Sequence, residues 1–164
     1  LGEVDGELAN SLALRGEVAR VIRMLRPQVI LAHDPWKHYR LHPDHRTAGF
    51  LVLDAVVAAR DPHFFPEHGL APHRPGAVLL FEADEPNHLE PATEPAVAAK
   101  LAALEAHKSQ LETTHFYRLE TGSDPVDPTD LFRRRERDKL ADAARACGTS
   151  ARVIGESFRL IDDL

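Results

Sequence analysis

The stretch RPQVILAHDPWKHYRLHPDHR, residues 26–46, contains a short apolar run followed by a polar loop, and four histidines lie within residues 33–45. Residues 28–33 are rich in branched apolar side chains, which is typical of a strand buried on both faces of a sheet. The helical pattern before this run ends at Pro27, and Asp44 is a candidate N-cap for a helix over residues 45–59. The order helix, buried strand, helix indicates an α/β fold.

Before this stretch, apolar side chains at three- and four-residue spacing predict a helix over residues 10–25, capped by Asn10 or Ser11. A second buried strand is expected over residues 76–82, between proline-rich loops at residues 61–75 and 84–95. Further helices are expected over residues 96–111 and 127–146, the latter ended by Gly148. The tail, residues 150–164, suits either a strand or a helix. Only two strands are clear among four helices, whereas a doubly wound sheet normally has more. We therefore predict the C-terminal part of a Rossmann-like three-layer α/β domain with a mostly parallel sheet.

Length and composition restrict the class of protein. The chain has 164 residues, which predicts a single domain over residues 1–164. Its net charge of -6 argues against general nucleic-acid binding, and no apolar run approaches the roughly 18 residues that span a membrane. The single Cys147 forms no internal disulfide, so we expect a cytoplasmic protein. Because residue 1 is Leu and Met24 is the only methionine, we also expect an N-terminally truncated domain.

The histidine-rich loop is the first candidate site. His42 and His45 flank Asp44 at the carboxyl end of the predicted strand, where open α/β sheets bind ligands. Neutral imidazole is a good zinc ligand, and a carboxylate can either bind the metal or orient a ligating histidine. In the alternative interpretation, Pro43 and Asp44 form only a turn and an N-cap, and both histidines are solvated.

The neighbours of these histidines suit a polar substrate. Arg40 and Arg46 fit an anionic or polyhydroxylated molecule, or are ordinary surface arginines. Trp36 and Tyr39 either form an apolar wall for a sugar ring or anchor the loop by packing. The sequence contains no GxGxxG, P-loop or nucleophile elbow, so nucleotide binding and serine hydrolysis find no support.

Residues 33–36 (HDPW) and 41–46 (LHPDHR) resemble the second signature of the PIG-L/LmbE-like deacetylases. These zinc-dependent enzymes remove an N-acetyl group from substrates that contain N-acetylglucosamine. Residues 1–8, the pair at 26–27, and Lys100 followed by residues 107–110 (HKSQ) are similar to other stretches of the family. The resemblance runs over most of the chain, and the HPDH box is its most specific part.

The resemblance implies a role for seven residues. His45 would be a zinc ligand, and His42 would stabilise the tetrahedral intermediate or protonate the leaving amine, with Asp44 as its orienting partner. Asp5 would contact a sugar hydroxyl, Arg40 stands where some relatives carry a tyrosine close to the reaction centre, and His107 and Gln110 would lie near the substrate.

The largest departure from the family is the absence of its first His-Pro-Asp-Asp box. The remaining zinc ligands and the general base are therefore expected outside this segment. The leading hypothesis is a zinc-dependent N-acetyl deacetylase that uses a metal-activated water on an amino-sugar conjugate. Alternatives are a non-catalytic metal- or sugar-binding module, a degenerate relative that acts as an interaction partner, and a chain completed by another polypeptide or by a second copy of itself.

Overall fold

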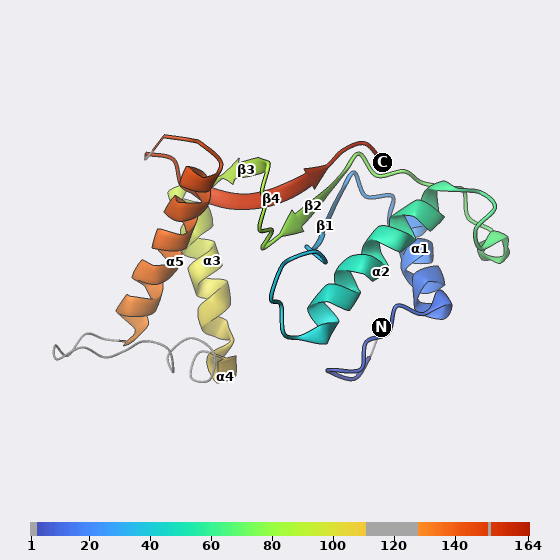
Figure 1. Cartoon of the computed structure of the whole chain (residues 1–164), viewed down its shortest axis with the longest axis horizontal. Helices are drawn as coiled ribbons and strands as arrows, with labels where there is room; N and C mark the ends of the chain where they lie inside the picture. Colours follow the sequence, from blue (N-terminus) through green and yellow to red (C-terminus); the bar gives the residue numbers. More distant parts are fainter. Residues whose placement is uncertain (1–2, 111–127, 151) are drawn as a thin grey trace. The chain divides into compact units, whose positions relative to one another are not determined.

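The computed structural model describes residues 3–110, 128–150 and 152–164. The chain forms two compact units, the first from residues 1–88 and 158–164 and the second from residues 89–157. Residues 33–45, which carry the clustered histidines, lie entirely in the first unit (Figure 1). The expectation of a single domain over residues 1–164 stays a prediction.

In the first unit, helix α1 (Leu12–Leu25) leads into strand β1 (Val29–His33), as predicted. The Ser11 hydroxyl accepts a hydrogen bond from the Leu14 N–H at 3.2 Å and so caps α1. Helix α2 (Pro43–Arg60), the short 3₁₀ helix η1 (Pro66–His68) and strand β2 (Ala77–Phe81) follow. The predicted helix at the front, the two strands and the second helix are therefore confirmed.

The start of α2 corrects one prediction. His42 occupies the N-cap position without a side-chain hydrogen bond, and Asp44 lies inside the first turn. Proline favours the first helical position because its missing N–H would have no partner there, so Pro43 sets the start two residues earlier. The prediction that Asp44 caps this helix is wrong, and its carboxylate is free for other contacts.

The sheet confirms the α/β class. Strands β1 and β2 are parallel, and His33 lies opposite Phe81. The tail is strand β4 (Gly155–Ile161), which pairs antiparallel with β2 and places Leu160 opposite Leu79. The strand order is β1-β2-β4-β3. Strand β3 (His88–Pro91) lies in a stretch predicted to be a proline-rich loop.

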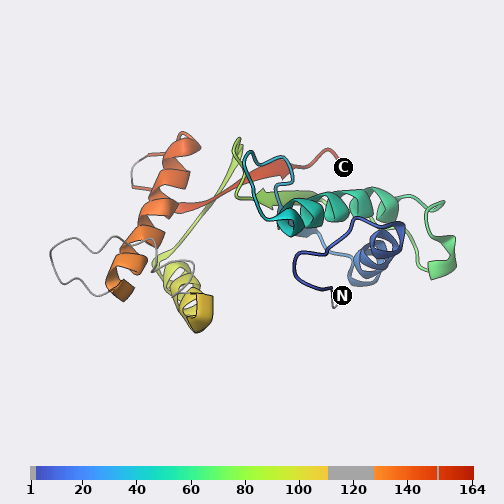
Figure 2. The same ribbon diagram turned by 60° about the horizontal axis from the view of Figure 1, so that its bottom comes forward.

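Helices α1 and α2 pack on one face of strands β1 and β2 (Figure 2). The core contains Ala19, Ile22, Ala32, Ala55, Val56, Ala58, Ala59, Val78 and Leu80. The opposite face of β1 is exposed to solvent, since Val29 and Leu31 are 51% and 61% exposed. The prediction that this strand is buried on both faces is wrong, because the apolar run alternates between a covered row and an open row.

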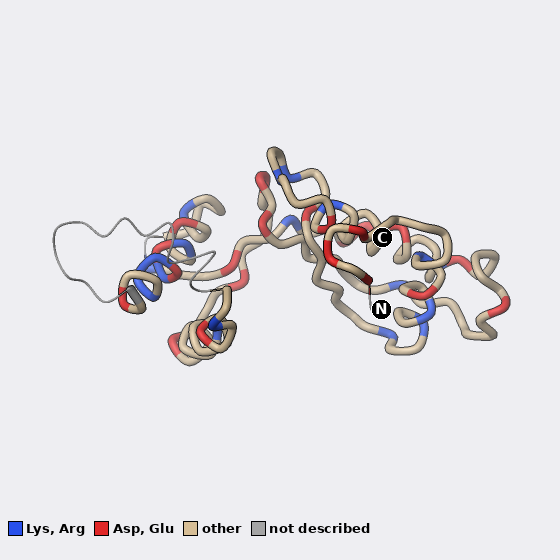
Figure 3. The backbone as a smooth tube through the Cα atoms, turned by 90° about the horizontal axis from the view of Figure 1, so that it is seen from below, with Lys and Arg blue, Asp and Glu red and all other residues tan. Residues whose placement is uncertain are grey.

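The second unit contains helices α3 (Glu94–Ala106), α4 (Lys108–Gln110) and α5 (Pro128–Ala146). Its core consists of Val97, Leu101, Phe132 and Leu140. Helix α5 carries both acidic and basic residues along its length (Figure 3). Arg133 and Arg137 donate to Glu105 and Glu94 of α3 at 2.6 and 2.8 Å, so these two arginines of the basic run are paired with carboxylates within the unit.

Both helix predictions for this unit are largely confirmed. The predicted helix at 96–111 begins earlier, at Glu94, and is interrupted at His107. Leu111 and Asp127, at the ends of the two predictions, lie outside the described residues. Gly148 adopts a φ of 72° just beyond α5, the left-handed conformation that glycine takes at a helix end. Across the described residues, no helix combines the length and apolarity that a membrane span requires.

Candidate functional site

The carboxyl ends of β1 and β2 and the first turn of α2 bring His33, His45 and Glu82 together. His33 ends β1, Glu82 directly follows β2, and His45 lies in the first turn of α2. A Cβ atom added at Gly49 would lie 2.5 Å from the His33 carbonyl oxygen. The missing side chain of Gly49 therefore allows α2 to approach the end of β1, and His45, one turn earlier, comes to lie beside His33.

Three histidine rings lie close together at this edge. The His33 and His45 rings are stacked with centroids 4.3 Å apart and planes inclined by 14°. The His42 ring lies 5.1 Å from the His45 ring, with planes inclined by 31°. Histidines from a strand end and a helix start, up to twelve positions apart in the sequence, thus share one surface.

The Arg40 guanidinium lies among His33, His45 and Glu82, which we call the inner cluster. Its Nη1 is 2.8 Å from His45 Nδ1 and 3.3 Å from His33 Nδ1. Its Nη2 donates to Glu82 Oε2 at 2.5 Å. Because a guanidinium has only donors, both imidazole nitrogens accept, and in this arrangement both rings have an unprotonated Nδ1. The inner cluster therefore offers three acceptor atoms to one cation.

The protonation preferences of the inner cluster agree with this geometry. Burial lowers the pKa of His33, and the charges of His45 and Arg40 lower it further. Partial burial by itself raises the pKa of Glu82, but the hydrogen bond and charge of Arg40 outweigh it and lower the pKa. These shifts favour a neutral imidazole and an ionised carboxylate, the two forms that bind metal ions.

Asp5, His42 and Asp44 form a second group, the outer cluster. His42 Nε2 lies 3.4 Å from Asp5 Oδ1, and both side chains are well exposed. The two oxygens of Asp44 accept hydrogen bonds from the backbone N–H groups of Gly6 and Leu8, at 2.6 and 3.2 Å. Asp44 therefore holds the turn that carries Asp5, and Asp5 is the carboxylate beside His42.

Each cluster has three possible metal-ligand atoms within 4.8 Å of one another. Two imidazole nitrogens and a carboxylate oxygen are a donor set that zinc takes in hydrolytic enzymes, and the inner cluster already surrounds a cation. The residues present therefore fit a zinc ion. In the outer cluster, the Asp44 oxygens are already engaged by backbone N–H groups.

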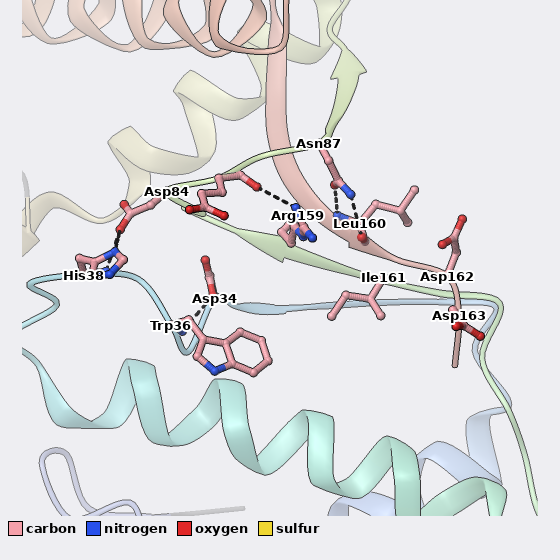
Figure 4. Close-up of a pocket in the computed structure, with 11 residues that line it drawn as sticks. Asp34, Trp36, His38, Asp84, Asn87, Arg159, Leu160, Ile161, Asp162 and Asp163 are labelled. Carbon is pink, nitrogen blue, oxygen red and sulfur yellow. Dashed lines mark hydrogen bonds and ion pairs between the residues drawn. The ribbon is translucent and has the colours of Figure 1, made fainter.

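A pocket of about 640 Å³ opens beside the loop that follows β1 (Figure 4). Asp34, only 7% exposed, lines it and accepts a hydrogen bond from the Trp36 N–H at 2.9 Å. Trp36 lines the same pocket and packs edge-on against Phe50, with centroids 5.6 Å apart. This tryptophan therefore both anchors the loop and offers an apolar wall, whereas Tyr39 is 97% exposed.

The structure places the predicted site residues in three locations. His45 and Arg40 belong to the inner cluster, whereas Asp5, His42 and Asp44 form the outer cluster. His107 and Gln110 lie in the second unit, and their role near the substrate stays a prediction. His33 and Glu82, the other two candidate ligands of the inner cluster, were not among the predicted site residues. Position at the carboxyl ends of neighbouring parallel strands is the signal that could have indicated them.

A family model and two curated relatives match parts of this chain, and all three are described as deacetylases of acetylated amino sugars. Residues 1–56 match the family model described as PIG-L: GlcNAc-PI de-N-acetylase. The diacetylchitobiose deacetylase of Thermococcus kodakarensis is 39% identical over 109 residues, which are 65% of this chain and 40% of that protein. A 1D-myo-inositol 2-acetamido-2-deoxy-alpha-D-glucopyranoside deacetylase of Catenulispora acidiphila is 42% identical over 52 residues, 32% of this chain and 16% of that protein.

Solved structures extend the likeness to nearly the whole chain. The N,N'-diacetylchitobiose deacetylase of Pyrococcus horikoshii, crystallised with an inhibitor, matches with a TM-score of 0.75 and 26% identity over 98% of this chain and 55% of that one. A conserved protein from Thermus thermophilus matches in fold, with a TM-score of 0.65 and 21% identity over 100% of this chain and 64% of that one. This chain thus spans less than half of the Thermococcus relative.

Proposed function

We propose that this chain, which belongs to the PIG-L/LmbE-like family, is part of a zinc-dependent hydrolase that removes the N-acetyl group of an N-acetylglucosamine-type amino sugar. The observation that carries the proposal is the juxtaposition of a possible metal ligand with a possible proton donor. His45 lies among the donors of the inner cluster, and the His42 ring is 5.1 Å away. The names of three relatives, each a deacetylase of an acetylated amino sugar, support the substrate class.

The residues of the chain would divide the work of amide hydrolysis. A zinc ion bound through His45 would polarise the acetamide carbonyl and activate water. His42, exposed and 3.4 Å from Asp5, is placed to hold a proton at Nε2 and to deliver it to the leaving amine nitrogen. Asp44 would act through the backbone, because it fixes the turn that presents Asp5.

The proposal extends to setting and partners. We propose that the ligand is a small amino sugar, that the protein works in the cytoplasm, and that nucleic acid is not a partner, which the acidic net charge supports. The exposed row of Val29 and Leu31 supports an association that covers the open face of β1, either with a second copy or with another polypeptide.

A chimera tests the activity. The part of the Thermococcus kodakarensis enzyme that has no counterpart in this chain is joined to residues 1–164, and amine release from N,N'-diacetylchitobiose is measured. We expect turnover that His45→Ala abolishes and His42→Ala lowers by about 10²- to 10⁴-fold. His63→Ala, a change on an exposed loop of the same unit, is the matched control. If His42→Ala and His45→Ala leave amine release unchanged, the proposed function is wrong.

A further inference from the structure

We propose that His33, His45 and Glu82 form a three-donor metal site within this chain, that Arg40 is a tethered cation occupying it, and that a divalent metal binds only by displacing Arg40. This inference deepens the proposed function by naming ligands in the chain itself. It concerns metal binding alone, so it can fail or hold independently of any turnover.

The convergence of the donors carries the inference. Arg40 Nη1 contacts the Nδ1 atoms of His45 and His33 at 2.8 and 3.3 Å, and Nη2 contacts Glu82 Oε2 at 2.5 Å. His33 Nδ1 and Glu82 Oε2 are themselves 3.9 Å apart. All three acceptors therefore already face one positive charge. Imidazole nitrogen and carboxylate oxygen are also first-choice ligands of zinc.

Arg40 is buried but incompletely satisfied. Its side chain is 8% exposed, although Glu82 beside it is 58% exposed. Among the described residues, its Nε is a buried nitrogen without a hydrogen-bond partner. Leaving the cluster would return this N–H to water, and release of Arg40 would therefore offset part of the cost of breaking its three contacts.

The residues on either side of Arg40 are exposed, so the loop can move and carry Arg40 out of the inner cluster. Its neighbours Tyr39 and Leu41 are 97% and 94% exposed, so displacement of Arg40 breaks little packing on either side. Lys37 and His38 anchor the start of the loop through contacts of 2.9 and 3.0 Å with Asp84. The segment can therefore swing between this anchor and Pro43 of α2 without unfolding the helix.

A metal ion and the Arg40 guanidinium cannot occupy the inner cluster at the same time. Both are cations that need the same Nδ1 and carboxylate atoms, and their charges repel at these distances. Removal of the guanidinium should therefore strengthen metal binding. Removal of any one donor should weaken it.

The test is calorimetric titration of the metal-free 164-residue protein with zinc ion alone. We expect one zinc per chain, bound about 10- to 100-fold more tightly by Arg40→Ala than by the unmodified protein. In the Arg40→Ala background, His33→Ala and Glu82→Gln should each weaken binding by at least about tenfold. Arg20→Ala removes an equal charge from the exposed side of α1 and should leave the affinity unchanged. Equal zinc affinity for Arg40→Ala and the unmodified protein would overturn the proposal, as would unchanged affinity for the two donor variants.

A second measurement needs no variant, in case Arg40→Ala does not fold. One equivalent of zinc is added to the unmodified protein, and the imidazole nitrogen resonances and the Arg40 Nε–H resonance are followed by NMR. We expect the Nδ1 signals of His33 and His45 to shift together with the Arg40 signal. Shifts confined to His42, or no shift at His33, would contradict the proposal.

Discussion

The inner and outer clusters resemble each other in composition but differ in what their donor atoms already contact. Each places three candidate ligand atoms within 4.8 Å, and both lie at the start of α2. In the inner cluster, all three acceptors face the guanidinium of Arg40. In the outer cluster, Asp44 accepts from two backbone N–H groups, and Asp5 is 92% exposed.

Under the proposal above, this difference separates a candidate metal site, the inner cluster, from a structural contact, the outer cluster. A cation at the Asp44 carboxylate would compete with the N–H groups of Gly6 and Leu8 for its charge and would weaken the anchor of the turn that they carry. The inner cluster would exchange one cation for another. We infer that proximity of donors is a weaker guide to a metal centre than the charge their present partners carry.

The largest predicted effect distinguishes the two clusters directly. His45→Ala should lower the zinc affinity of the 164-residue protein by at least about 100-fold, because it removes a ligand, whereas His42→Ala should change it by no more than about twofold. Calorimetric titration of both variants measures this. An equal loss of zinc affinity in the two variants would mean that both clusters belong to one metal site.

The next prediction concerns the contact that builds the inner cluster. Gly49→Ala should destabilise the fold by roughly 1–3 kcal/mol, because the added methyl group would overlap the His33 carbonyl oxygen 2.5 Å away. Denaturant unfolding followed by circular dichroism measures the loss. Arg46→Ala, an exposed change on the same helix, is the control. A Gly49→Ala protein of unchanged stability would mean that α2 does not approach β1 this closely.

A smaller effect is expected in the outer cluster. Asp44→Ala should cost about 1 kcal/mol and speed amide hydrogen exchange at Gly6 and Leu8, because both N–H groups lose their acceptor. Zinc affinity should stay unchanged. If zinc binding is lost instead, Asp44 is a ligand, and the division between the clusters is wrong.

The smallest effect tests the anchor of the Arg40 loop through its pH dependence. The hydrogen bond from Lys37 and those from His38 lower the pKa of Asp84 to about 2, from a usual value of 3.8. Because the folded pKa is depressed, this contribution is present above pH 3.8 and is lost as the pH falls toward 2. Asp84→Asn should flatten the dependence of unfolding free energy on pH in this window. An identical slope in the variant would show that the anchor carries no stability.

Local periodicity and capping accounted for most of the fold. The spacing of Leu14, Val18 and Val21, with Ser11 as cap, predicted α1, and branched apolar runs predicted β1 and β2. Strand β3 could not be predicted, since its residues lie in a proline-rich stretch and pair with the distant chain end. The exposure of Val29 and Leu31 also escaped prediction, because an apolar run does not reveal what covers each face.

The site was partly visible in the sequence. The HPDH box indicated His42, Asp44 and His45, because two imidazoles beside a carboxylate at a strand end are typical of metal sites. Glu82 is 37 positions from His45, and only the parallel register that sets His33 opposite Phe81 brings it close. Arg40 was assigned to substrate binding, since nothing local shows that its guanidinium faces two imidazole nitrogens.

X-ray absorption at the zinc edge, for the 164-residue protein loaded with one equivalent of zinc, tests directly whether His33 and His45 both bind the metal. The inner cluster predicts two imidazole nitrogens at about 2.0 Å, together with carboxylate or water oxygens in the same shell. The spectrum of His33→Ala should show one imidazole nitrogen fewer, and the spectrum of His33→Ala/His45→Ala should show neither imidazole nitrogen. A single imidazole in the unmodified protein, or a spectrum unaffected by His33→Ala, would contradict the account.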